Sequence, residues 1–247
     1  RRLLHHAVHR HEALQVRHRL QRARLGKGHG GGDLRRDVRV DPRRLIGGQL
    51  VEITAAVENA AEVFGQIMLH QVDYADLYFQ YSRHESWSLE EGQVKSGSHD
   101  IVQGVGIRAV SGEKTGFAYS DEIMLPALLE AAGAARAIVQ QGTQGRVPAA
   151  FRGEAGRQLY RPDDPLASLP DDAKVKLLER VEQAARAQDP RVKQVMASLA
   201  STHEVVLVVR SDGVIAGDVR PLVRLNVSVI VEQDGRRESG SAGGGGR

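Results

Sequence analysis

Three His-Glu dipeptides are the residues of this sequence whose chemistry would matter most, because His and Glu together can bind zinc and activate water. A helical zinc site needs two His one turn apart, but the first His after His11 is His18. Two helical turns separate such residues by about 10 Å, too far for both to bind one ion. The other two dipeptides have no second His nearby and lie in strand-like segments. We therefore expect surface or strand-edge polar residues, and no metal site, at His11-Glu12, His84-Glu85 and His203-Glu204.

Other catalytic and nucleotide-binding motifs fail similar tests. The segment Gln103–Gly106 (QGVG) lies inside a predicted strand and opens no helix, so its glycines favour close packing or a bulge over dinucleotide binding. Neither a P-loop nor a GxSxG nucleophile motif occurs, and the chain has no Cys. The paired carboxylates Asp163-Asp164 and Asp171-Asp172 fall in a loop and at a helix start, where capping explains the second pair. The residues alone thus indicate no discernible catalytic centre.

The stretch Val72–Ser120 predicts an antiparallel meander. Apolar residues alternate with polar ones in it, which is typical of half-buried strands. A polar break is expected at Arg83–Glu85, and turns at Glu91-Gly92 and Ser111–Lys114. Further strands are expected at Val94–Ser96, Ile101–Val110, Phe117–Tyr119, Val192–Ala200, Glu204–Arg210, Val214–Ala216 and Val223–Val231.

Three amphipathic helices are predicted beside these strands. One begins near Thr54, one spans about Met124–Gln141 with Pro126 in its first turn, and one spans about Asp171–Gln188. Asp171 or Asp172 is expected to cap the third helix. The fold class is therefore α+β, an antiparallel β meander with three packing helices and a second, C-terminal β hairpin region.

Composition separates the first fifty residues from the rest. Residues 1–50 hold 13 Lys and Arg against 4 Asp and Glu, whereas the remainder holds 21 against 27. Clustered Arg can neutralise phosphates, so a nucleic-acid-binding arm is one interpretation. A disordered or non-native extension is the favoured one, since the segment lacks aromatic residues for base stacking. No apolar run suits a transmembrane helix or a secretory signal, and the absence of Cys fits a cytoplasmic protein.

Several long blocks of sequence resemble the TldD/PmbA metallopeptidase family, also called modulators of DNA gyrase. The blocks are DYADLYFQ (73–80), HESW (84–87), QGVGIR (103–108), SGEKTGFAY (111–119), DVRPLVR (218–224) and GGGGR (243–247). The resemblance covers about Val72 to Arg247 and implies a bacterial, cytoplasmic zinc peptidase. It implies that the protein cleaves unfolded or extended peptides and pairs with a PmbA/TldE-like partner subunit.

The resemblance also divides the chain. Residues 1–50 resemble nothing in the family and are set apart as the basic extension, whereas the resemblance implies an N-terminal domain of the family at 51–235 and a Gly-rich linker at 236–247 leading to a C-terminal catalytic domain. In the family, the zinc-binding HExxxH helix and a Cys ligand lie beyond this Gly-rich segment. No metal ligand or general base is therefore assigned here, no cofactor is expected within this chain, and the chain is expected to be inactive alone. Its expected role is to line a narrow substrate channel and to support assembly. The alternative is a non-enzymatic protein-binding module.

Six residues are candidates for a substrate channel or an interdomain contact. Arg220 and Arg224 flank an extended Pro-Leu-Val step, and either could hold a peptide carboxylate or a structural Asp or Glu. The four glycines Gly243, Gly244, Gly245 and Gly246 could form a loop that substrate backbone approaches closely, or an interdomain hinge.

Overall fold

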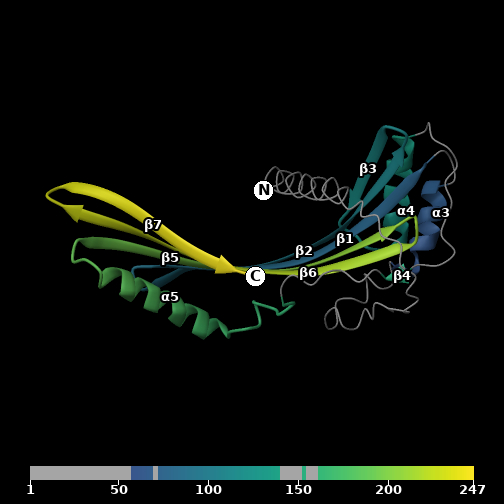
Figure 1. The fold of residues 1–247 in the computed structure, drawn as a ribbon. Coiled ribbons are helices and arrows are strands. Elements are labelled where there is room, and N and C mark those ends of the chain that lie inside the picture. The colour runs from purple at the N-terminus through teal and green to yellow at the C-terminus, as the bar shows by residue number, and fades with distance from the viewer. Residues whose placement is uncertain (1–56, 69–71, 140–151, 154–160) are drawn as a thin grey trace, which may run out of the picture. The chain divides into compact units, whose positions relative to one another are not determined.

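The computed structural model describes residues 57–68, 72–139, 152–153 and 161–247 (Figure 1). The helices are α3 (Ala60–Met68), α4 (Leu125–Ala137) and α5 (Asp171–Arg186). The strands are β1 (Tyr74–Glu90), β2 (Gln93–Ser111), β3 (Lys114–Ser120), β4 (Arg152–Gly153), β5 (Val192–Arg210), β6 (Val214–Gln233) and β7 (Arg236–Gly246). These elements form the predicted α+β fold. No helix among them is long and apolar enough to cross a membrane.

The strands form one seven-stranded sheet in the order β3-β2-β1-β5-β6-β4, with β7 also paired to β6 (Figure 1). The first three strands are neighbours in chain order, which confirms the predicted meander. β3 pairs with β2 in antiparallel register, with Ser111 opposite Lys114. The short strand β4 was not predicted, and it pairs in parallel with the start of β6.

The strands are longer than predicted. The polar break expected at Arg83–Glu85 is wrong, since β1 continues through it to Glu90. The predicted pairs of short strands likewise merge into the single strands β2, β5 and β6. Polar residues can stay inside a strand when the sheet brings them partners from distant parts of the chain.

The chain divides into two compact units, each built from three segments. Of the residues that the structure describes, unit 1 holds 57–68, 72–80, 103–139, 152–153 and 206–218, and unit 2 holds 81–102, 161–205 and 219–247. Each of β1, β2, β5 and β6 contributes residues to both units.

In unit 1, α3 and α4 pack together beside the sheet. Phe64 and Ile67 of α3 and Leu128 of α4 are fully buried. The Gln66 side-chain amide donates to the carbonyl oxygen of Leu129, and Arg136 donates to the carbonyl oxygen of Gln66 at 2.8 Å. α4 begins after the extended residue Met124 with proline in its first turn, as predicted. Thr54, near which the first helix was expected to begin, and Gln141, the expected end of the second, lie outside the described residues.

In unit 2, α5 packs on one face of the sheet. Leu178 of α5 contacts a buried cluster from β1 and β5, made of Leu89, Ala197 and Leu199. The predicted side-chain cap by Asp171 or Asp172 is wrong, because Pro170 precedes the helix and no side chain caps it. Both carboxylates lie in the first turn, where Asp171 accepts a hydrogen bond from Lys174 and Asp172 from Lys176.

The hairpin between β6 and β7 turns at Asp234 and Gly235, as predicted, and both residues have positive φ, 52° and 76°. Only glycine and small polar residues adopt this conformation easily. After the turn, residues 236–246 form strand β7 along β6. The sequence predicts a linker here, whereas the segment is a strand held by backbone pairing with β6. A glycine has the same backbone N–H and C=O groups for this pairing as any other residue.

Candidate functional site

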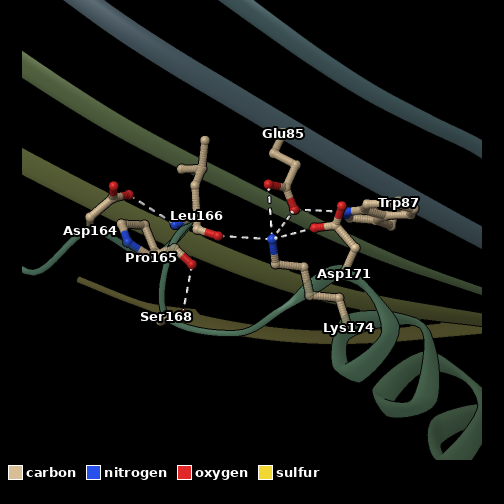
Figure 2. Close-up of polar contacts among 8 residues, drawn as sticks. All are labelled: Glu85, Trp87, Asp164, Pro165, Leu166, Ser168, Asp171 and Lys174. Carbon is tan, nitrogen blue, oxygen red and sulfur yellow. Dashed lines mark hydrogen bonds and ion pairs between the residues drawn. The ribbon is translucent and has the colours of Figure 1, made fainter. Parts of the chain in front are cut away.

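The most densely bonded polar group in unit 2 surrounds Lys174 of α5 (Figure 2). This side chain is only 3% exposed, and its ammonium group lies 2.7 Å from Glu85 Oε1. It also donates to the carbonyl oxygen of Leu166 at 2.8 Å and to Asp171 at 3.2 Å. Burial alone would lower the pKa of Lys174, but hydrogen bonds to Glu85 and Asp171 raise it overall. Lys174 is therefore a charged structural anchor, and not a neutral nucleophile.

Glu85 is the acceptor at the centre of this cluster. It is buried in β1, and the indole nitrogen of Trp87 donates to its Oε1 (Figure 2). The prediction that Glu85 is a surface or strand-edge residue is therefore wrong. The Glu85 carboxylate accepts hydrogen bonds from the Lys174 ammonium and the Trp87 indole, and these bonds offset the desolvation of its buried charge.

A second ion pair ties the segment before α5 to β1. Arg83 lies 2.5 Å from Asp164 Oδ2, and the other carboxylate oxygen accepts from the backbone nitrogen of Leu166 at 3.0 Å. Burial would raise the pKa of Asp164, but the hydrogen bond and charge of Arg83 lower it overall. The Ser168 hydroxyl donates to the carbonyl oxygen of Pro165 and closes a tight turn (Figure 2). Residues 164–168 are thus held at both ends.

The third His-Glu dipeptide is also buried, against prediction. His203 is 1% exposed, and its Nε2 has no hydrogen-bonding partner among the described residues. Burial lowers the pKa of His203, although the nearby Asp164 carboxylate opposes this shift. Glu204 accepts from Ser82 at 3.5 Å and lies 3.6 Å from Arg220. These residues anchor β1, β5 and β6 to one another.

These residues do not fit a metal ion. No group of three His, Cys, Asp or Glu side chains comes together in the part of the chain that the structure describes. His84, the partner of Glu85 in the dipeptide, instead contacts the Thr202 hydroxyl at 3.1 Å. Glu85 is already paired with Lys174, and Glu204 lies beside Arg220, so both carboxylates are engaged by cations of the chain itself.

The two candidate arginines have different surroundings. Arg220 lies beside the buried Glu204, which corresponds to the structural alternative. Arg224 is exposed, and its Nε donates to Asn226 Oδ1 at 3.0 Å. Both belong to β6; the Arg220 side chain is 31% exposed, and Arg224 belongs to the exposed class.

The four candidate glycines lie in β7 and not in a loop. Gly243, Gly244, Gly245 and Gly246 pair with Asn226, Leu225, Arg224 and Val223, respectively. A Cβ atom on Gly245 would lie 2.2 Å from the carbonyl oxygen of Val223, whereas one on Gly244 would meet nothing within 4 Å. The run therefore contains glycines that the packing requires and glycines that leave open space.

The glycines of the QGVG segment have a packing role at one position. A Cβ atom on Gly104 would lie 2.8 Å from the carbonyl oxygen of Ser120. This contact supports close strand packing, the interpretation that the sequence favoured.

Sequence reasoning missed a surface of small hydroxyl side chains in unit 2. Hydroxyls of neighbouring strands contact each other, Ser86 with Ser98 at 2.8 Å and Ser88 with Ser96 at 2.6 Å. Side chains alternate along a strand, so these serines face away from Trp87 and Leu89, which pack on α5. The same alternation places Ser198 between Ala197 and Leu199. The serines of this face, called the serine face, are Ser86, Ser88, Ser96, Ser98, Ser198, Ser228, Ser239 and Ser241. The same alternation places the exposed apolar residues Val94, Met196 and Leu222 among them.

The signal for the serine face was present in the sequence. Serines two positions apart occur in β1, β2 and β7, but a polar alternation shows only that one face is solvated. The pairing of strands, which decides whether such serines share a surface, was unknown.

Comparison with known proteins matches two successive parts of the chain to one family. Residues 75–139 match the profile of the PmbA/TldA metallopeptidase domain 1, and residues 164–247 match that of the PmbA/TldA metallopeptidase central domain. The "Metalloprotease TldD homolog" of Haemophilus influenzae is 52% identical over 184 residues, which cover 73% of this chain. The homolog of the same name from Buchnera aphidicola subsp. Schizaphis graminum is 44% identical over 72% of this chain. The chain spans 38% and 37% of the lengths of these relatives.

Solved structures show the same fold. A Bacteroides thetaiotaomicron protein described as a modulator of DNA gyrase aligns with a TM-score of 0.62 and 14% identity, over 76% of this chain and 44% of its own. TldE from Thermococcus kodakarensis aligns with a TM-score of 0.58 and 17% identity, over 77% of this chain and 42% of its own. With two family domains matched in order and a relative sharing half of the aligned residues, the chain belongs to the PmbA/TldD metallopeptidase family.

Proposed function

We propose that this chain is the part of a zinc metallopeptidase that lines the substrate passage and supports assembly, while the zinc site lies elsewhere in the complete enzyme. The observation that carries the proposal is the pair of family matches, to domain 1 and to the central domain, within a span that is 38% of a relative's length. The described residues offer no ligand set for a metal. Zinc would supply a polarised water for peptide hydrolysis, and this chain would supply surface and shape.

The serine face supports the channel role. Small hydroxyls bind water and accept or donate hydrogen bonds in any direction, so they favour no particular side chain of a passing polypeptide. α5 covers the other face of the sheet in unit 2, which leaves the serine side without a helix of that unit among the described residues. A wall of this kind suits extended peptides of varied sequence, and backbone pairing with an exposed strand edge would add sequence-tolerant affinity.

Assembly with a PmbA/TldE-like subunit is part of the same proposal. The likeness to TldE from Thermococcus kodakarensis supports a shared fold for the two kinds of subunit. Related folds often associate through equivalent surfaces, which would enclose the passage between two subunits.

A chimera tests the channel role. The aligned segment of the Haemophilus influenzae relative is replaced by that of this chain, and cleavage of a long unstructured peptide is compared with cleavage of a tripeptide. Ser198→Trp should narrow the passage and lower kcat/KM for the long peptide by about tenfold, or about 1.4 kcal/mol, while sparing the tripeptide. The control is Lys176→Trp on the exposed side of α5, where the side chain is 70% exposed. Equal effects of the two substitutions would refute the channel role.

The chain by itself tests the location of the catalytic site. We expect the 247-residue protein with added zinc to leave an unstructured peptide intact over hours, while the chimera cleaves it. Zinc-dependent cleavage by the chain alone would overturn the proposal.

A further inference from the structure

Three buried polar atoms of unit 2 have no hydrogen-bonding partner among the described residues. They are Tyr81 Oη, Arg83 Nε and His203 Nε2. No other described side chain of unit 2 holds such an atom. Buried polar groups nearly always have a partner, because a buried donor or acceptor without one retains the full cost of its desolvation. Three exceptions within one unit therefore indicate a partner that they share.

The pairing of β1 with β5 brings these three side chains together. Two side-chain contacts fix the antiparallel register at this place, Ser82 with Glu204 and His84 with Thr202. Arg83 and His203 lie between these pairs and are directly opposite each other, on the face of the sheet that α5 covers. Tyr81 projects from the same face two positions before Arg83, as a diagonal neighbour of His203 within reach of an aromatic side chain.

The hydrogen-bonding capacity of the three atoms specifies what can bind them. Arg83 Nε is a donor only, because a guanidinium keeps its protons. The ring of His203 forms a hydrogen bond with the backbone of Pro162, which can only accept because proline has no N–H. The proton therefore lies on Nδ1, and Nε2 is an acceptor in the neutral ring that burial favours by lowering the pKa of His203. A shared ligand must both accept and donate.

Charges close to the three atoms exclude an ion as this ligand. The Arg83 guanidinium itself opposes a cation. The Asp164 carboxylate, which is paired with Arg83 and acts electrostatically on His203, opposes an anion, as does the lone pair of His203 Nε2. A buried ion would need compensation that these groups do not offer. A neutral water molecule fits instead, because buried waters typically make about three hydrogen bonds to such groups.

We propose that one water molecule binds between Tyr81, Arg83 and His203, accepting hydrogen bonds from the first two residues and donating one to the third. The proposal is independent of the peptidase function. This water joins β1 to β5, and His203 extends the link to Pro162 in the segment ahead of α5. His203 thereby becomes a positioning residue for that segment, together with the ion pair of Arg83 and Asp164.

Removing the Tyr81 hydroxyl tests the proposal through the sign of its effect. Tyr81→Phe loses a hydrogen bond to the water and should raise the equilibrium constant for unfolding about three- to tenfold. A buried hydroxyl with no partner predicts the opposite, because its removal would relieve a desolvation cost. Tyr119→Phe is the matched control at a side chain that is 51% exposed, and it should change the constant less than about twofold. Stabilisation by Tyr81→Phe, or no effect, would overturn the proposal.

A double-mutant cycle tests whether Tyr81 and His203 share one partner. Tyr81→Phe and His203→Leu should be non-additive, with the equilibrium constant of the double variant at least about twofold below the product of the single effects. Tyr81→Phe combined with Lys176→Met, on the exposed side of α5, should be additive. Additive effects of Tyr81→Phe and His203→Leu would contradict a shared water.

A crystal structure of the 247-residue chain that resolves ordered solvent identifies the ligand directly. We expect one water oxygen within about 3.2 Å of Tyr81 Oη, Arg83 Nε and His203 Nε2. A direct bond between Tyr81 and His203, or a dry contact of the three side chains, would refute the proposal.

Discussion

Lys174 Nζ lies 2.7 Å from Glu85 Oε1, and 89 residues of chain separate these two buried side chains. The pair joins α5 to β1, and the same carboxylate accepts a hydrogen bond from the indole nitrogen of Trp87. A buried ion pair contributes little net stability compared with apolar residues, but the loss of one partner leaves an uncompensated charge. The cluster therefore specifies where α5 packs.

Replacing the ammonium should be costly. Lys174→Met is expected to lower the free energy of unfolding by about 3–5 kcal/mol, because Glu85 would remain buried without its cation. Adding Glu85→Leu should recover much of the loss. Lys176→Met removes an exposed pair with Asp172 and should change stability by less than about 1 kcal/mol. Urea unfolding followed by circular dichroism and by Trp87 fluorescence measures all three; a small effect of Lys174→Met alone would contradict the anchor role.

Acid should destabilise the protein through His203. Burial holds the pKa of this residue below its ordinary 6.5, so the unfolded chain takes up a proton before the folded one does. Its contribution is fully present above pH 6.5 and is lost as the pH falls through the folded-state pKa. His203→Gln should flatten the fall in stability from about pH 7 to about pH 5. Denaturant unfolding at several pH values measures this slope, and an unchanged slope in the variant would exclude His203 as its cause.

One glycine of β3 should not tolerate a side chain. A Cβ atom on Gly116 would lie 2.0 Å from the carbonyl oxygen of Ala135 in α4. Gly116→Ala is therefore expected to destabilise by about 1–3 kcal/mol through overpacking. Gly133→Ala, within α4, meets only Gln66 at 3.6 Å and should stabilise by up to about 1 kcal/mol. Thermal unfolding should move in opposite directions for the two variants; a shared direction would disprove the close approach of β3 to α4.

The glycine run of β7 offers a similar comparison. Gly245→Ala would place a Cβ atom 2.2 Å from the carbonyl oxygen of Val223 and should weaken the β6–β7 pair. Gly244→Ala enters open space and should be neutral or stabilise by about 0.4–1 kcal/mol through the unfolded state. Amide hydrogen exchange of residues 236–246 measures the pairing. Faster exchange in both variants, or in neither, would contradict the alternation of crowded and open glycine positions along β7.

The elements that local sequence determines were predicted well. Pro126 fixed the start of α4, and Asp234-Gly235 fixed the β6–β7 turn, because each residue constrains its own backbone. The alternation within Val72–Ser120 indicated strands for a different reason, because every second side chain of a strand faces the same side of its sheet.

The polar interior could not be predicted in this way. Arg83, Glu85 and His203 suggested breaks or surface positions, because their partners Asp164 and Lys174 lie far away in the sequence or come from a different element. The strand β7 was missed because glycine has a low strand preference, and only pairing with β6 makes its backbone regular.

The sharing of β1, β2, β5 and β6 by both units has a consequence for how the protein can fail. Each unit is assembled from three pieces of chain, so no single cut releases either one intact. A one-residue slip of a strand exchanges its two faces along its whole length, so it would expose core residues in both units together. The register of these four strands is therefore common to both units, and the unit that forms first sets it for the other.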